Sequence, residues 1–328
     1  MRRFHYGWVI VGTGCVVVFA CLGLARFGYG MVLPAMKSGL GLTNAQAGAV
    51  ATVDMVAYLA MAMLGGVLSA RFGPRIVISV ALAVTALGML ATGLAQGAWT
   101  AAAARVLTGM GSGASNVPAM GMLAAWALPR RRGLAAGIVV SGSSIGLMVL
   151  GPVVPKLITA FGTGGWRAAW VVFSVVTLAI AAMAWALLRN RPSDLGLQPL
   201  GADGIADAGQ GSEGPRGRGR DVIRSMGVWH LGAVYTAFGF SYIIYMTFFV
   251  DRLISEAGYT HAAAGRLFMA MGFFSLGCGV LWGSLSDWIG RRWALTLIYL
   301  MHAAAFSLFA VGTEPVAFLV SALLFGLS

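Results

Sequence analysis

Charged residues are scarce in this sequence: they occupy 10% of its 328 positions, whereas hydrophobic residues occupy 59%. A soluble protein of this length would interrupt its apolar segments with polar faces. Here, apolar stretches of about 20 residues recur along most of the chain, and a helix of that length crosses the roughly 30 Å hydrocarbon core of a bilayer. The shortage of charge therefore argues against a soluble globular protein and predicts an all-α polytopic membrane protein.

Cysteines and catalytic motifs are also sparse. The three cysteines, Cys15, Cys21 and Cys278, lie within apolar stretches without a CxxC pair or other metal-ligand spacing, so we interpret them as small buried hydrophobic residues. The sequence lacks HExxH, GxSxG and a Walker lysine, and no polar segment is large enough for a nucleotide-binding domain. We therefore expect no enzyme activity, no cofactor and no metal site.

The apolar segments predict nine membrane spans and the beginning of a tenth. The first follows the basic start MRRFHYGW, and its apolar segment exceeds the roughly 7–15 residues of a cleaved signal peptide, so we expect it to be retained. The tenth begins near Pro315 and reaches Ser328 without a polar tail, which suggests a C-terminally truncated chain. The nine complete spans are expected near residues 8–33, 46–70, 76–96, 99–128, 133–155, 166–188, 227–250, 262–286 and 293–312.

A polar segment separates the sixth span from the seventh. Residues 189–224 are rich in Gly, Pro, Asp and Arg and contain too little apolar surface to stabilise an ordered fold. We predict a disordered cytoplasmic linker at 189–225. It divides an N-terminal six-helix bundle at 1–188 from a partial C-terminal bundle, helices 7–10, at 226–328.

The net positive charge, formally +12, falls mainly on one face of the predicted membrane protein. Basic residues in short loops set the orientation, with the richer face in the cytoplasm. We therefore expect a cytoplasmic N-terminus, and the excess of arginine over lysine, with abundant Ala and Gly, favours a bacterial source and hence the inner membrane. The tract PRGRGR (215–220) would suit RNA binding in isolation, but it belongs to the same loop face, so no nucleic-acid partner is expected. The richer face holds 15 basic residues, Arg2, Arg3, Arg71, Arg75, Arg130, Arg131, Arg132, Arg189, Arg191, Arg216, Arg218, Arg220, Arg224, Arg291 and Arg292, and the opposite face holds five, Lys37, Lys156, Arg167, Arg252 and Arg266.

An internal repeat relates two segments that each follow the second span of their half. GVLSARFGPR (66–75) and GSLSDWIGRR (283–292) share the spacing of their glycines and final arginine at an interval of 217 residues. Asp287 of the second copy corresponds to Ala70 of the first. Repeats in the same orientation predict two bundles related by an axis along the membrane normal. The matched pairs are Gly66 and Gly283, Leu68 and Leu285, Gly73 and Gly290, and Arg75 and Arg292.

The second copy, G-x-L-x-D-x-x-G-R-R, resembles motif A of the major facilitator superfamily. Arg105, Gly109 and Gly111 resemble its motif B, and GSSIGLMVLGP (142–152) its motif C. FHYGW and RPSDLGL are similar to the oxalate/formate and monocarboxylate-like branches, whereas LARFGYGMVLPAM and LTNAQAG resemble the YbfB-like branch. The resemblance implies a monomeric transporter of two six-helix bundles, with about ten of twelve helices present, that works by alternating access.

By the same resemblance, the two copies form a gating motif on the cytoplasmic side. Asp287 is expected near the start of the fifth helix, at Arg132 to Leu134, because a helix N-terminus attracts a carboxylate. This contact would close the cytoplasmic gate. The gating motif comprises Gly66, Arg71, Gly73, Arg75, Gly283, Asp287, Gly290, Arg291 and Arg292.

Three ionisable residues, Arg26, Asp54 and Arg105, lie within predicted spans, where a charge is costly and indicates a functional site. Arg26 and Asp54 are each 14 residues from position 40, near the middle of the first extracytoplasmic turn. Equal offsets on antiparallel helices mean equal depth, so we predict an Arg26–Asp54 pair in which Arg26 binds a substrate anion and Asp54 carries a proton. Tyr29 and Tyr58 follow on nearly the same faces. Three alternatives stay open: a snorkelling Arg26, a purely structural Asp54, and a packing role for Arg105 in place of binding or coupling.

The predicted seventh helix contains further polar side chains, in the segment GFSYIIYMTFF (239–249). Resemblance to the superfamily places helices 1, 4 and 7 around a central cavity, so Ser241, Tyr242 and Tyr245 are candidates to line it. Helix packing is the alternative for these side chains. His302, on the ninth helix, is interpreted as a satisfied packing residue.

The sequence as a whole predicts a secondary active transporter with a small-molecule substrate and the lipid bilayer as its partners. Arg26 and the resemblance favour a proton-coupled carrier of a small organic anion. The alternatives are efflux of drug-like molecules or metabolites, and a non-transporting membrane receptor or scaffold.

Overall fold

The computed structural model describes residues 5–202 and 226–328, which form helices joined by short turns. The first membrane segment, Gly7–Leu40, is continuous, but its middle is π-helical, so it comprises α1, η1 and α2. Gly162–Gly164 forms a single 3-10 turn before α7. The elements of the first half are α1 (Gly7–Val18), η1 (Phe19–Phe27), α2 (Gly28–Leu40), α3 (Asn44–Phe72), α4 (Pro74–Gly93), α5 (Ala98–Trp126), α6 (Pro129–Phe161) and α7 (Gly165–Leu187).

The second half supplies five helices among the described residues. The predicted eighth span is divided at Gly277, whose neighbours belong to different helices. Otherwise each predicted span falls on one continuous helical segment. The helices are α9 (Met226–Ser255), α10 (His261–Leu276), α11 (Cys278–Ile289), α12 (Arg291–Val311) and α13 (Pro315–Leu327).

Length and hydropathy confirm an all-α polytopic membrane protein. Six segments of the described chain are long and apolar enough to cross a membrane, and one of them, Arg130–Leu187, contains both α6 and α7. Large apolar side chains such as Met63, Val67 and Phe240 remain exposed on the outside of the helices. In a bilayer such side chains face hydrocarbon, so their exposure costs nothing there.

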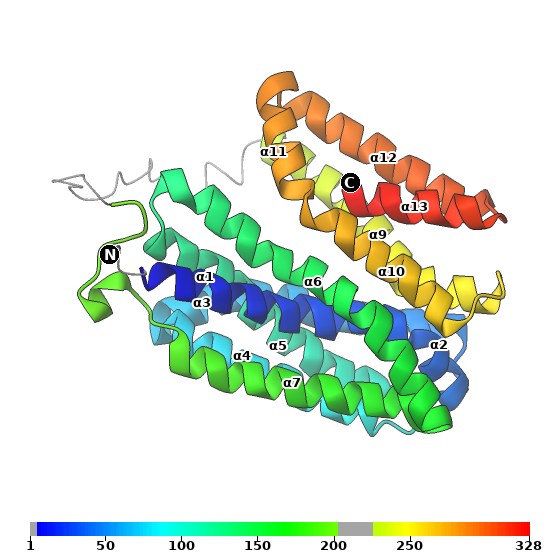
Figure 1. Ribbon diagram of the computed structural model, residues 1–328. Helices are drawn as coiled ribbons and strands as arrows, with labels where there is room; N and C mark the ends of the chain where they lie inside the picture. Colours follow the sequence, from blue (N-terminus) through cyan, green and yellow to red (C-terminus); the bar gives the residue numbers. More distant parts are fainter. Residues whose placement is uncertain (1–4, 203–225) are drawn as a thin grey trace.

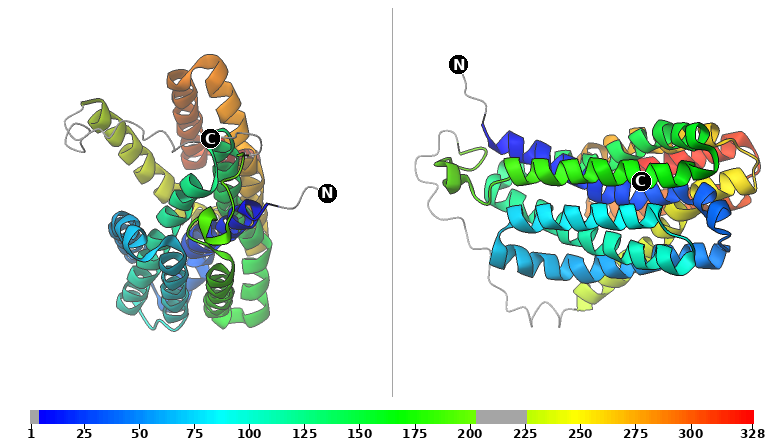
Figure 2. Two further views of the ribbon diagram at one scale, coloured as in Figure 1. Left: turned by 90° about the vertical axis from the view of Figure 1, so that its left-hand side faces the viewer. Right: turned by 90° about the horizontal axis from the view of Figure 1, so that it is seen from below.

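Two helical bundles lie side by side (Figure 1). Helices α1 to α7 form the first bundle, in which α3, α4, α5 and α7 run alongside one another (Figure 2, right). Helices α9 to α13 form the second. The bundles meet where α10 packs along α6 and where α9 packs against α2.

The two ends of the bundles differ in charge. We call the end with the turns at 72–74, 127–130 and 289–291 the Arg-rich end, and the end with the turns at 40–44, 93–98 and 255–261 the Arg-poor end. Gly73 and Gly290, matched by the repeat, adopt nearly the same conformation, with φ of 85° and 84°. Glycine tolerates this region far better than other residues. The repeat therefore extends from the sequence to the backbone.

The first part of the predicted linker is ordered, contrary to the expectation of disorder over 189–225. The Leu200 backbone N–H donates to the Trp126 carbonyl (2.8 Å), and the Leu128 N–H donates to the Leu200 carbonyl (3.1 Å). The Leu200 side chain is 5% exposed and packs in an apolar cluster with Val11 and Val139. One well-placed leucine thus fastens this polar segment to the first bundle. The rest of the linker, 203–225, lies outside the described residues.

Candidate functional site

A cavity of about 960 Å³ separates the two bundles. It extends from Tyr242, deep between the bundles, to Leu134 and Ser284 near the Arg-rich end, where the bundles diverge (Figure 1). The described lining residues include serines, aromatic residues and Cys278 but no Asp, Glu, Lys or Arg. The cavity is therefore large and uncharged over the part of its wall that the structure describes.

A second, much smaller cavity of about 20 Å³ adjoins the inner end of the large one. Phe27, Tyr242 and Met246 line both cavities and form the wall between them. A water molecule needs roughly 10–15 Å³ measured in this way, so the small cavity has room for about one. Its lining includes Arg26, Tyr29, Asp54 and Arg105. Four of the predicted site residues therefore converge here, together with Tyr242 in the wall.

Asp54 and Arg105 form a buried ion pair. Arg105 Nη2 lies 3.0 Å from Asp54 Oδ1, and the two side chains are only 1% and 5% exposed. The Arg105 Nη1–H also donates to the Ala25 carbonyl (2.9 Å), and the guanidinium lies over the rings of Tyr29 and Trp170 at 5.1 and 5.2 Å. Arg105 Nε has no hydrogen-bond partner among the described residues, so the guanidinium approaches Asp54 through Nη2 alone. Mutual neutralisation makes both charges tolerable inside a membrane.

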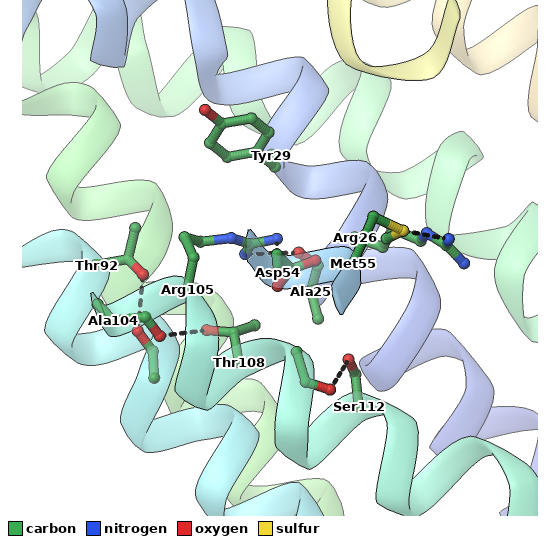
Figure 3. A network of polar contacts seen from close by, with 12 residues as sticks. Ala25, Arg26, Tyr29, Asp54, Met55, Thr92, Ala104, Arg105, Thr108 and Ser112 are labelled. Carbon is green, nitrogen blue, oxygen red and sulfur yellow. Dashed lines mark hydrogen bonds and ion pairs between the residues drawn. The ribbon is translucent and has the colours of Figure 1, made fainter. Parts of the chain in front are cut away.

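The predicted Arg26–Asp54 pair is wrong in this conformation. Arg26 points away from Asp54 and toward the sulfur of Met55 (Figure 3), and among the described residues no ion pair joins Arg26 to Asp54. Both residues line the same small cavity, as their equal depth predicts, but depth does not determine which way a side chain faces around its helix.

Packing between α3 and α5 explains why Arg105 is the partner. A Cβ at Gly109 would overlap the Asp54 carbonyl oxygen, so α5 lies directly against α3 at this point. Arg105 is one turn before Gly109 on the same face of α5. The glycine therefore brings the Arg105 side chain to Asp54. The pattern RVLTG (105–109) could have predicted this pairing, because its arginine and glycine are four residues apart and so lie on the same face of the helix.

Arg26 has an aromatic rather than an acidic environment. Its guanidinium lies 5.1 Å from the ring centroid of Tyr58 and 5.8 Å from that of Tyr242, and it contacts the sulfur of Met55. It is half-buried on the π-helical segment η1, and such segments frequently occur at functional sites. Two arginines and one aspartate line the small cavity, which leaves a net charge of +1 among its described residues.

The four predicted tyrosines have different roles. The Tyr29 hydroxyl donates to the Ala47 carbonyl, and the Tyr58 hydroxyl accepts from Asn116, both at 2.8 Å. Tyr242 separates the two cavities. Tyr245 is 2% exposed, pairs with the Ser321 hydroxyl at 2.7 Å and lines neither of these cavities, so it packs the second bundle in this conformation.

Sequence reasoning missed an aromatic cluster around Tyr242. Phe238 and Phe325 stack on Tyr242 with centroid distances of 5.8 and 5.9 Å, and Phe27 meets its edge. His302 lies 5.0 Å from both Phe238 and Phe325 and lines the large cavity, and neither of its ring nitrogens has a hydrogen-bond partner in the described part of the chain. His302 therefore packs among aromatic rings, as the sequence suggested, but its ring nitrogens are not paired as that interpretation assumed. The four-residue spacing of Phe238 and Tyr242 was the available signal.

The gating motif is asymmetric in its contacts. The Arg75 backbone N–H donates to Asn190 Oδ1 (3.0 Å) and its Nε–H to the Trp185 carbonyl (2.8 Å), so it fastens the start of α4 to the end of α7. Asp287 is exposed on α11, and Arg132 instead donates to carbonyls of its own bundle. The expected contact of Asp287 with the start of α6 is thus not formed in this conformation. Three further arginines of the motif are exposed, namely Arg71, Arg291 and Arg292.

The Arg-poor end is closed by a contact between the bundles. Lys37 Nζ of α2 lies 2.8 Å from Asp251 Oδ2 of α9. The Asp251 side chain is 8% exposed and that of Lys37 22%. Phe249 and Leu253 are completely buried on the same helix. The bundles therefore touch at this end and separate at the other.

Two packed helical bundles around a central cavity define the class of membrane transport folds to which this structure belongs. The family model of the Major Facilitator Superfamily matches residues 15–328, and the chain belongs to that superfamily. A solved structure of a bacterial homolog to the human lysosomal transporter Spinster, in an inward-facing and unoccupied conformation, has the same fold. Its TM-score is 0.73 at 18% identity, over 100% of this chain and 74% of that one.

Two curated relatives are similar along most of this chain. The hexuronate transporter of Bacillus subtilis (strain 168) is 24% identical over 274 residues, covering 83% of this chain and 62% of the relative. The oxalate:formate antiporter of Oxalobacter formigenes is 22% identical over 297 residues, covering 90% of this chain and 67% of the relative. The chain thus spans about two thirds of the length of these relatives.

Proposed function

We propose that the protein is a secondary transporter that carries a small organic anion by alternating access. This proposal rests mainly on the environment of Arg26. Its guanidinium has no acidic partner among the described residues and lies at the inner end of the cavity between the bundles. A cation held between ring faces is available to an anion that enters from the cavity. The two relatives described above transport organic anions according to their names, which supports this choice.

The distribution of basic residues supports a cytoplasmic Arg-rich end. With that orientation the large cavity faces the cytoplasm, and the Lys37–Asp251 pair closes the opposite side. Transport then requires the reverse arrangement, in which the Lys37–Asp251 contact breaks and the Arg-rich end closes. The motif residue Asp287 and the start of α6 are the groups that we expect to meet there.

The neighbouring ion pair supplies a way to couple the anion to a proton. Protonation of Asp54 would remove its negative charge and raise the net charge of the small cavity from +1 to +2. Arg105 would then be free to join Arg26 in attracting an anion. A bound anion would in turn favour the charge that the proton brings, so proton and anion would assist each other's binding.

Uptake into proteoliposomes tests the proposal. Radiolabelled carboxylates would be supplied with and without a pH gradient to the unaltered protein and to Arg26→Ala, Asp54→Asn and Arg266→Ala. We expect saturable uptake that Arg26→Ala abolishes, that Asp54→Asn uncouples from the pH gradient while exchange persists, and that the exposed control Arg266→Ala leaves intact. Saturable binding without uptake would instead support a receptor, and uptake of cations alone would refute anion transport.

A further inference from the structure

If the protein carries a small organic anion, as proposed above, the residues around Arg26 also indicate which class of anion it binds. We propose that the substrate is an aromatic monocarboxylate, whose carboxylate is bound by Arg26 and whose ring packs against Tyr242 at the inner end of the large cavity. Three features of the site favour this class of anion: its charge, the hydrogen-bonding groups of the cavity wall and the stacking of its aromatic side chains.

The charge of the site suits one carboxylate. The small cavity carries a net charge of +1, because Asp54 already neutralises Arg105. The described wall of the large cavity adds no charged side chain. A second carboxylate on the substrate would therefore lose its hydration without gaining a cation, which is costly in a membrane interior.

The hydrogen-bonding groups of the wall do not suit a hydroxyl-rich body. Ser141, Ser143 and Ser275 line the large cavity, but each hydroxyl already donates to a carbonyl of its own helix, at 2.7, 2.8 and 2.8 Å. These three serines are left as weak acceptors, and among the described lining residues only Ser144, Ser284, Tyr242 and His302 keep polar side-chain atoms without a partner. A sugar acid would bring several hydroxyl groups that find few partners, and buried polar groups without partners lower affinity strongly.

The aromatic side chains at the inner end favour a flat ring. Tyr242 stacks on Phe238 and Phe325 with interplanar angles of 22° and 12°. Its hydroxyl has no hydrogen-bond partner among the described residues. A substrate ring could pack against this cluster while its carboxylate reaches Arg26, and it would replace ring contacts that Tyr242 gives up when it moves.

Binding must move the wall between the cavities. The small cavity holds about one water, which is less than a carboxylate needs. Tyr242 is half-buried and contacts Arg26 through its ring rather than through a hydrogen bond. The Tyr242 side chain can therefore give way to the carboxylate without losing a hydrogen bond. The large cavity, at about 960 Å³, has ample room for a single-ring acid.

Binding of a matched set of probes to the purified chain in lipid nanodiscs tests this inference by titration calorimetry. Benzoate is the reference, benzamide its neutral isostere, terephthalate its dianion, cyclohexanecarboxylate its non-aromatic analogue and glucuronate a polar monoanion. We expect benzoate to bind most tightly. Benzamide, terephthalate and glucuronate should bind about tenfold or more weakly, because each lacks a charge contact or leaves groups unpaired. Cyclohexanecarboxylate should bind about two- to tenfold more weakly, because it cannot stack.

Three variants separate the contributions. Arg26→Gln should reduce benzoate to the affinity of benzamide. Tyr242→Leu should weaken benzoate but leave cyclohexanecarboxylate nearly unchanged, and Arg266→Gln, on an exposed face of α10, should change neither.

The outcomes distinguish this inference from the proposed function. Tighter binding of glucuronate or of a dianion that still depends on Arg26 would overturn the aromatic monocarboxylate and leave anion transport standing. Tightest binding of a neutral or cationic probe, independent of Arg26, would overturn both. Failure of benzoate to bind to protein that unfolds cooperatively on heating would also overturn the inference.

Discussion

The Arg-poor and Arg-rich ends of the molecule differ in how the two bundles are held. At the Arg-poor end, one largely buried ion pair, Lys37–Asp251, joins α2 to α9. At the Arg-rich end, Asp287 stands exposed on α11, and the start of α9 and the α11–α12 hairpin splay apart (Figure 2, left). Each end thus has an acidic residue of the second bundle, Asp251 or Asp287, but only Asp251 is paired with a residue of the first bundle. We therefore expect the conformation to depend on which of the two acidic residues is paired.

Labelling from one side of the membrane tests which end faces the cytoplasm, and its result is all or none. In a background without Cys15, Cys21 and Cys278, we expect Ser38→Cys at the Arg-poor end to react with an impermeant maleimide added outside intact cells. Ser193→Cys, which is exposed at the Arg-rich end, should react only after the cells are opened. Reaction of both positions from outside would overturn the proposed orientation and with it the direction in which the cavity faces.

Removal of the charge at Asp251 should have the largest effect on the balance between the two ends. Asp251→Asn leaves Lys37 without its partner, and breaking a buried pair costs about 3–5 kcal/mol. Because Lys37 is 22% exposed and water stabilises it in part, we expect about 2 kcal/mol, or roughly a 30-fold shift toward the state with the Arg-poor end open.

Spin-label distances across both ends measure this shift. The charge-swapped double variant Lys37→Asp/Asp251→Lys is the matched control and should restore the original distances. Unchanged distances in Asp251→Asn would show that apolar packing, rather than the ion pair, holds the Arg-poor end closed.

Arg75 and Arg292 offer a comparison between the repeats at the Arg-rich end. Arg75→Ala removes the hydrogen bond of its side chain to Trp185 and the contact with the indole ring, which should destabilise the first bundle by about 1 kcal/mol. Arg292→Ala changes an exposed side chain and should leave the unfolding temperature nearly unchanged. Thermal unfolding of both variants checks this. An equal loss of stability would mean that Arg75 and Arg292 contribute equally to the stability of the fold.

Asp287→Asn should have the smallest effect on the observed conformation, because Asp287 makes no ion pair among the described residues. Its effect should appear in the reverse state, which would lose the contact with the start of α6. We therefore expect a modest shift toward the conformation with the Arg-rich end open, visible as longer spin-label distances when substrate is present. Identical distance distributions in Asp287→Asn and in the unaltered protein, both with substrate present, would argue against this gate.

The fold follows from the sequence more completely than the site does. Span lengths, the 217-residue repeat and the glycines at 73 and 290 determine where helices lie and where they turn, because hydrophobicity and backbone conformation are local properties. The break at Gly277 was not predicted, since it falls inside an apolar run without a proline. The ordered, buried position of Leu200 was not predicted either, because the apolar residues that pack against it are distant in the sequence.

The partner of Asp54 shows where sequence reasoning reaches its limit. Counting residues along two helices gives depth, but the choice between Arg26 and Arg105 depends on how the helices are rotated. That rotation is fixed by the close approach of α5 to α3 at Gly109. The π-helical turns of η1 add to the difficulty, because they carry more residues per turn than the count assumed.

Cys278 gives the chain a native chemical reporter of its own state. It is a half-buried free thiol that lines the large cavity, whereas Cys15, also half-buried, lines neither of the two cavities and Cys21 is buried. A small thiol reagent supplied from the Arg-rich end should modify it while that end is open. The rate of this reaction should fall when substrate occupies the cavity or when the bundles close over it. Occupancy and gating can therefore be followed as a rate of alkylation in the unaltered sequence, without any introduced label.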